Sequence, residues 1–196
     1  MSDVINNYYN ELVILMIAIC LIGVLIMLIP IFQTKKQNNK IMEDADLNED
    51  EIKKIDATLD KEKLKKEIFS LYKKVEVAKT KFDYNTLKET LDESLYQEEE
   101  QNLKQLKKEK QKLVATNIKL QEIKFLSIEN NKDIETIKIY LHVSQYDYII
   151  DNKKKIIRGT DDSVYQIEYK ITLEKNKDKQ FKIKTKECIG KWIKNN

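Results

Sequence analysis

The sequence predicts one membrane-spanning helix followed by a soluble α+β domain, in which helices precede an antiparallel sheet. Three observations lead to this prediction: an uncharged apolar run near the start, helical spacing of apolar residues in the middle, and apolar–polar alternation in the last third. The run, from Leu12 to Phe32, contains no charged side chain. At 1.5 Å of rise per residue it spans the ~30 Å hydrocarbon core of a bilayer. We therefore expect a single transmembrane helix over residues 12–32.

The charges beside this run predict its orientation. They are Asp3 and Glu11 before the run and Lys35, Lys36 and Lys40 after it. Because basic residues favour the cytoplasmic side of a span, we expect residues 1–11 to be a short extracytoplasmic tail and everything after the span to be cytoplasmic. The expected location is the cell membrane.

Processing of this N-terminal segment is not expected. A cleaved signal peptide has a basic start and a small-residue cleavage site, whereas this start is acidic and Pro30 to Phe32 close the run. A lipid anchor would need a small residue before Cys20, but Ile19 is bulky. The sequence favours a retained span.

The composition limits the remaining possibilities. After the span, the 196-residue chain has room for one domain of about 130 residues. Charged residues make up 35% of the chain, yet the net charge is only +3, which argues against wholesale nucleic-acid binding. The two cysteines, Cys20 and Cys188, predict no disulfide, which fits a reducing compartment. Abundant Lys, Ile and Asn with few Gly and Pro are typical of an AT-rich bacterial genome.

A charged linker is predicted over residues 33–57, because this stretch is polar and lacks apolar periodicity. Its later part is acidic, and like charges keep a chain extended. We expect the segment to tether the span to a domain over residues 58–188, with residues 189–196 as a C-terminal tail.

Three helices are predicted after the linker. From Asp60 to Phe82, apolar residues recur at spacings of three and four, with Asp60 as the N-cap. The residues from Phe82 to Asn85 end this helix and cap a shorter one. A third helix is predicted from about Glu93 to Val114, with acidic residues early and basic residues late, as the helix dipole prefers.

The strands are predicted from the period of two that begins after Asn117. The first predicted strand has a slip or bulge between Leu120 and Ile123. The later strands are expected at Ile137–Ile150, at Ile156–Arg158 ended by Gly159, at Tyr165–Leu173 and at Phe181–Thr185. Neither helices nor strands can bury their apolar sides alone, so we expect the helices to cover one face of an antiparallel meander.

No motif for nucleotide binding, metal binding or nucleophilic catalysis occurs in the sequence. The one histidine, His142, lies between Leu141 and Val143 in a predicted strand and is expected to be half exposed rather than catalytic. We predict no catalytic residue, no cofactor and no metal.

The candidate binding residues are aromatic and basic. Aromatic side chains suit a groove for a peptide, an acyl chain or a small ligand, although tyrosine is also common in ordinary sheets. The aromatic candidates are Tyr140, Tyr146, Tyr148, Tyr165, Tyr169 and Trp192. Lys182, Lys184 and Lys186 alternate and predict a basic stripe that either meets phospholipid headgroups or RNA or forms the solvated side of an edge strand.

Several stretches between about Asp60 and Cys188 together resemble the Tim44-like domain family. They are Ser70–Ala78, Phe82–Leu87, Ile137–Val143, Tyr146–Asp151 and Arg158-Gly159. This family is named for a subunit of the mitochondrial inner-membrane import translocase and also occurs in membrane-tethered bacterial proteins. The resemblance implies a cystatin-like or nuclear transport factor 2-like cone, with helices packed on a curved antiparallel sheet. It also implies a membrane-associated scaffold without enzymatic activity.

The resemblance has limits. Some bacterial relatives append a zinc ribbon, but no second cysteine follows Cys188, so a four-ligand zinc site is not expected. The import partners of the mitochondrial protein bind outside this domain, and an import function is not implied.

Taken together, the sequence predicts a single-pass bacterial membrane protein that presents a non-enzymatic Tim44-like domain at the cytosolic face. The domain would bind a protein partner or an anionic lipid. One alternative is an isomerase- or hydratase-type enzyme that uses Asp147 beside Tyr146 and Tyr148, which requires the Asp147 carboxylate to lie in a cavity. Another is contact with the ribosome or RNA through the lysine stripe, although nucleic acid is not the expected partner.

Overall fold

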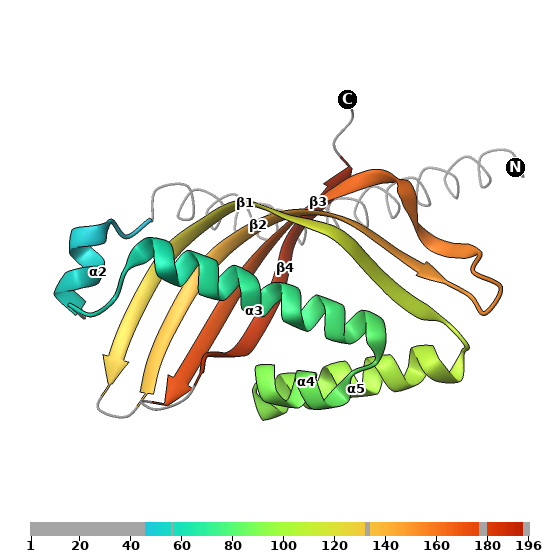
Figure 1. Ribbon diagram of the computed structural model, residues 1–196, viewed down its shortest axis with the longest axis horizontal. Helices are drawn as coiled ribbons and strands as arrows, with labels where there is room; N and C mark the ends of the chain where they lie inside the picture. The colour runs from blue at the N-terminus through green and yellow to red at the C-terminus, as the bar shows by residue number, and fades with distance from the viewer. Residues whose placement is uncertain (1–45, 56, 132–133, 177–179, 194–196) are drawn as a thin grey trace, which may run out of the picture. The chain divides into compact units, whose positions relative to one another are not determined.

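Helices precede strands in the part of the chain that the computed structural model describes, which is residues 46–55, 57–131, 134–176 and 180–193 (Figure 1). The elements are α2 (Glu49–Ile55), α3 (Lys61–Lys81), α4 (Tyr84–Thr90), α5 (Glu93–Lys108), β1 (Lys112–Asn131), β2 (Ile134–Ile150), β3 (Ile156–Asn176) and β4 (Lys182–Ile193). The strands form one antiparallel sheet in the order β1-β2-β3-β4. The predicted α+β architecture, with a curved open sheet that fits the cone fold, is confirmed.

The core lies between the helices and one face of this sheet, here named the inner face. Figure 1 shows α3 running across the strands. Its buried residues include Leu64, Ile68 and Val75, which recur along one helix face. On β2, alternate residues from Ile137 to Val143 face this core and are 0% exposed. The opposite side, the outer face, carries Tyr140, His142 and Ser144 of the same strand.

The ends of the first helices follow local signals in the sequence. The Asp60 carboxylate accepts a hydrogen bond from the Lys63 backbone N–H at 2.7 Å, and Asp83 accepts one from Thr86 at 3.1 Å. Phe82 ends α3 in the left-handed conformation, at φ 54°. The predicted caps of both helices are confirmed.

The third predicted helix is shorter than expected. It ends at Lys108, Lys110 takes a left-handed φ of 55°, and β1 begins at Lys112. Leu113 and Val114, assigned to the helix from their spacing, pair instead with Ile149 and Tyr148 of β2. The prediction was wrong there because strand pairing with a distant segment overrides a weak helical preference.

Gly159 does not end a strand, as the sequence predicted, but lies within the long strand β3. Its φ is +80°, and it pairs with Tyr148. Thr160 pairs with Asp147 and Tyr165 pairs with Gln145. Between these two pairs β3 therefore advances by five residues while β2 advances by only two. The intervening residues of β3 form a wide bulge.

The folded region also extends beyond the predicted domain boundaries at both ends. Residues 46–55, assigned to the linker, include α2, whose Ile52 is 0% exposed and belongs to the core. Residues 189–193, assigned to the C-terminal tail, continue β4.

The predicted span, residues 12–32, lies outside the described residues. Within the described ranges, no helix has both the length and the apolarity needed to cross a bilayer.

Candidate functional site

A buried ion pair joins α3 to β4 on the inner face. The Lys186 Nζ atom lies 2.6 Å from Glu76 Oε1, and the two side chains are 9% and 4% exposed. The same ammonium lies over the rings of Tyr72 and Tyr169, at 5.6 and 5.1 Å from their centroids. A buried charge requires a close partner, so this pair holds the helix against the last strand.

The electrostatics of this cluster favour its charged state. Burial alone would raise the pKa of Glu76, but the ammonium groups of Lys186 and Lys79 outweigh burial and lower that pKa to about 2. Burial raises the pKa of both Tyr72 and Tyr169. At neutral pH the two tyrosines therefore stay protonated, and the negative charge of Glu76 is balanced by the positive charge of Lys186.

Neutral and ionic contacts extend the cluster to neighbouring elements. The Tyr72 hydroxyl donates to Gln145 Oε1 of β2 at 3.1 Å. Lys79 of α3 lies 2.9 Å from Glu99 of α5, with both side chains largely buried. These contacts connect α3, α5, β2 and β4, so the cluster is a structural brace of the inner face.

The residues proposed for the enzymatic alternative do not converge. The Asp147 carboxylate forms an ion pair with Lys191, whose ammonium also lies 4.5 Å from the Tyr165 ring centroid. Tyr146 and Tyr148 flank Asp147 in β2 and therefore point to the opposite face of the sheet. The geometry does not place a free carboxylate beside a tyrosine hydroxyl at this position.

The sheet separates the aromatic candidates into two groups. Tyr165 and Tyr169 pack on the inner face with the core. Tyr140, Tyr146, Tyr148 and Trp192 belong to the outer face. The Tyr140 hydroxyl donates to Glu168 Oε1 at 2.6 Å, whereas Trp192 is 42% exposed beside His142, at 5.7 Å between ring centroids.

The three lysines of β4 do not form the basic stripe that the sequence predicted. Leu173 pairs with Ile183 but Thr172 pairs with Thr185, so the extra residue, Lys184, changes the alternation. Lys182 donates to the Lys88 carbonyl, Lys184 pairs with Glu174, and Lys186 turns inward to Glu76. Each lysine already has a partner.

A hollow of about 690 Å³ on the outer face was missed by sequence reasoning. Its lining comes from β1, β2, β3 and the end of β4 and includes Asn117, Gln121, Ser144, Tyr146, Ser163 and Gln166. Of the residues that the sequence singled out, Tyr146 lines this hollow. The available signal was indirect: both Asn117 and the polar run Asp161 to Ser163 interrupt the alternation of a strand.

Hydrogen bonds orient two of the amide side chains in this hollow. Gln121 Nε2 donates to the Ser144 hydroxyl at 2.9 Å, and Gln166 Oε1 lies 3.0 Å from His142 Nε2. The hollow therefore offers a polar surface with few charged side chains.

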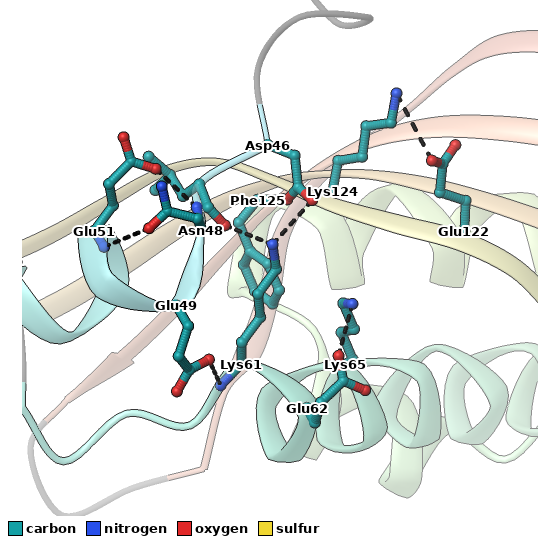
Figure 2. Close-up of polar contacts among 11 residues, drawn as sticks. Asp46, Asn48, Glu49, Glu51, Lys61, Glu62, Lys65, Glu122, Lys124 and Phe125 are labelled. Atoms are coloured by element: carbon teal, nitrogen blue, oxygen red, sulfur yellow. Dashed lines mark hydrogen bonds and ion pairs between the residues drawn. The ribbon is translucent and has the colours of Figure 1, made fainter.

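The first described residues are held by a clasp made by Asp46, Leu47, Lys61 and Phe125. Figure 2 shows Asp46, Lys61 and Phe125 of this clasp. Asp46 Oδ1 accepts the Phe125 backbone N–H, and Oδ2 accepts Lys61 Nζ, both at 2.9 Å. The Leu47 N–H donates a hydrogen bond to the Phe125 carbonyl, and the Leu47 carbonyl accepts one from Lys61 Nζ at 2.6 Å. These bonds cover part of the free edge of β1 and hold Asp46 and Leu47 against the domain.

Replacing Asp46 with alanine is expected to open this clasp. The Phe125 N–H and the Lys61 ammonium would lose a shared carboxylate, at a cost of about 1–2 kcal/mol. Hydrogen exchange at the Phe125 amide of the full-length chain should accelerate at least several-fold. Asp50→Ala, at an exposed position of the same segment, is the matched control and should leave that amide unchanged. Equal protection in both variants would contradict the clasp.

Comparison with known protein families identifies the family of this domain. The family model of the Tim44-like domain matches residues 46–186. A solved structure, that of the intermembrane space region of the chloroplast protein ARC6, is similar with a TM-score of 0.48 and 15% identity, over 66% of this chain and 96% of that chain. No curated protein matches the chain. Since the family match covers most of the chain and begins at the clasp residue Asp46, the chain belongs to the Tim44-like domain family.

Proposed function

We propose that this chain is a single-pass bacterial membrane protein that holds a Tim44-like domain at the cytosolic face, where the domain binds a protein partner without catalysing a reaction. The family match over residues 46–186 carries this proposal, because the family consists of membrane-associated protein-interaction modules. The uncharged run from Leu12 to Phe32 supplies the membrane anchor, and the lysines that follow it supply the orientation.

The clasp supports a role in presentation. Because Asp46 and Leu47 are bonded to β1, the ordered contacts of the folded domain begin at Asp46. A domain that follows a membrane anchor in the same chain meets membrane-bound partners at a raised effective concentration.

A protein partner is favoured over anionic lipid or RNA. Lys182, Lys184 and Lys186, the candidate residues for contact with phosphate groups, are each engaged within the domain. A surface that binds phosphates needs several free cations on one face. The bonded lysines of β4 do not provide such a surface.

The sidedness can be tested at Cys188, one of the two cysteines of the chain. Cys188 is an exposed free thiol. In intact cells that express the full-length chain with Cys20→Ser, a membrane-impermeant maleimide should leave Cys188 unlabelled, and permeabilised cells should show labelling. Asn7→Cys in a Cys20→Ser, Cys188→Ser background is the control and should react in intact cells. The chain should also stay with the membrane pellet during alkaline carbonate extraction.

Labelling of Cys188 in intact cells would place the domain outside and overturn the proposed location. Release of the chain by carbonate would overturn the anchor.

A further inference from the structure

We propose that the hollow on the outer face is the surface that receives the protein partner, and that it takes an extended segment with uncharged polar side chains. The inference rests on the proposed function, since it names the binding surface of that module. It goes further by specifying the location and the chemistry of recognition.

Two strand irregularities create the hollow on opposite sides of β2. Thr116 and Lys119 of β1 pair with Tyr146 and Ser144 of β2, so β1 has one more residue than β2 between these two pairs. On β3, the wide bulge between Thr160 and Tyr165 opposes the same part of β2. Bulges bend strands away from the regular sheet and are common beside binding sites. Here they leave a hollow whose 690 Å³ is within the range of about 300–1,000 Å³ that is typical of ligand sites.

The lining side chains have unused hydrogen-bonding capacity. Within the described ranges, the side chains of Asn117, Tyr146 and Ser163 have no hydrogen-bond partner. Gln121 and Gln166 are oriented by one bond each, and each amide has further donor or acceptor positions. An extended polypeptide presents N–H and C=O groups at regular intervals, and side-chain amides and hydroxyls can bond to both.

The charge of the lining selects the class of partner. The lining residues include one lysine, Lys119, and one aspartate, Asp162, so the hollow has no net charge. This balance disfavours phosphate-rich ligands, which need a concentration of cations. It equally disfavours strongly basic or acidic peptides, because one opposite charge does not offset the repulsion and desolvation of a charged run.

An apolar border adds a second element of recognition. Val164 and Ile193 line the hollow, and the side chain of Ile193 is 38% exposed. Trp192, which is 42% exposed, precedes Ile193 in β4. Exposed aromatic and branched side chains beside a polar hollow are suited to hold one apolar side chain of a bound segment.

The one tryptophan of the chain, Trp192, pairs with Gln166, which lines the hollow, and therefore serves as a reporter beside this surface. Full-length chain in phosphatidylcholine nanodiscs is titrated with synthetic peptides of about ten residues, built from Asn, Gln, Ser and Thr around one Leu. The same peptides with added Lys or Glu residues are compared, as are phosphatidylglycerol vesicles and a single-stranded RNA. We expect a saturable blue shift of Trp192 emission with at least one neutral peptide and a weaker response to its charged versions.

Two variants locate the binding. Ser163→Arg places a long cationic side chain in the hollow. It should lower the affinity of the chain for the neutral peptide by about tenfold or more. Thr185→Arg adds the same charge at an exposed position of β4 outside the hollow and should bind like the unmodified chain. Equal affinities in the two variants would overturn the inference. So would a response only to the vesicles or the RNA, or no response to any neutral peptide.

Failure here is separate from failure of the proposed function. The labelling and extraction experiments test the anchor and the sidedness without using the hollow. A membrane-anchored, cytosolic domain whose hollow ignores neutral peptides would therefore lose this inference alone.

Discussion

Replacing Lys186 with methionine is expected to destabilise the domain by about 3–5 kcal/mol. The substitution keeps the apolar stem but leaves the Glu76 carboxylate, 4% exposed, without its closest cation. Lys79 stays near the cluster but is already paired with Glu99. Urea denaturation of the full-length chain in micelles at pH 7 measures the loss.

The pH dependence distinguishes a lost charge partner from lost packing. In the unmodified chain the pKa of Glu76 is lowered from 4.5 to about 2. Stability from this group, about 3 kcal/mol, is therefore complete above pH 4.5 and is lost as the pH falls toward 2. Without Lys186, burial raises the pKa of Glu76 instead. Protonation of Glu76 then removes the unpaired buried charge and stabilises the variant. The difference in unfolding free energy between the two chains should narrow as the pH falls from 7 to 4.

Two further variants serve as controls. Glu76→Gln combined with Lys186→Met removes both charges and should recover much of the lost stability, since no unpaired charge remains buried. Lys104→Met breaks the exposed pair with Glu100 on α5 and should have a small effect. If the single and double variants at the buried pair were equally unstable at every pH, the buried carboxylate would not be the cause.

Gly159→Ala is expected to cost about 2–4 kcal/mol. The backbone of Gly159 has a φ of +80°, which disfavours any side chain. An added Cβ would also lie 2.4 Å from the Asp147 carbonyl oxygen and 2.8 Å from Tyr148 Cα. Both are backbone atoms of the neighbouring strand, so relief requires β2 and β3 to separate where Tyr148 pairs with Gly159. The melting temperature and the exchange of the β2 amides near Tyr148 measure the effect.

Gly190→Ala is the matched control for this substitution. A Cβ at Gly190 would approach the Glu168 Oε2 atom at 2.7 Å, but a carboxylate at the end of a side chain can move away. We therefore expect a cost below about 1 kcal/mol. Equal destabilisation by the two alanine substitutions would contradict the interpretation of the Gly159 backbone.

The local features of the domain were predicted from the sequence because each depends on nearby residues. The caps at Asp60 and Asp83 need only a carboxylate a few positions before free backbone N–H groups. The amphipathic pattern of α3 and the alternation of β2 are likewise properties of a short window. The α+β order followed from these elements.

Features that depend on pairing between distant segments were decided by the tertiary structure. The end of α5, the position of Gly159 inside β3 and the inward turn of Lys186 all follow from the register between strands. A bulge changes which face a residue occupies, and no count along one strand reveals it. The hollow on the outer face and the clasp at Asp46 arise in the same way.

By itself, then, the sequence determined that helices precede strands, the starts of α3, α4 and α5, the alternation of β2 and the uncharged run from Leu12 to Phe32, since each is encoded in consecutive residues. The tertiary structure alone decided which lysines are paired, which tyrosines share a face and where the hollow of the outer face lies. Those properties depend on the alignment of β1, β2, β3 and β4, whose paired residues are far apart in the chain.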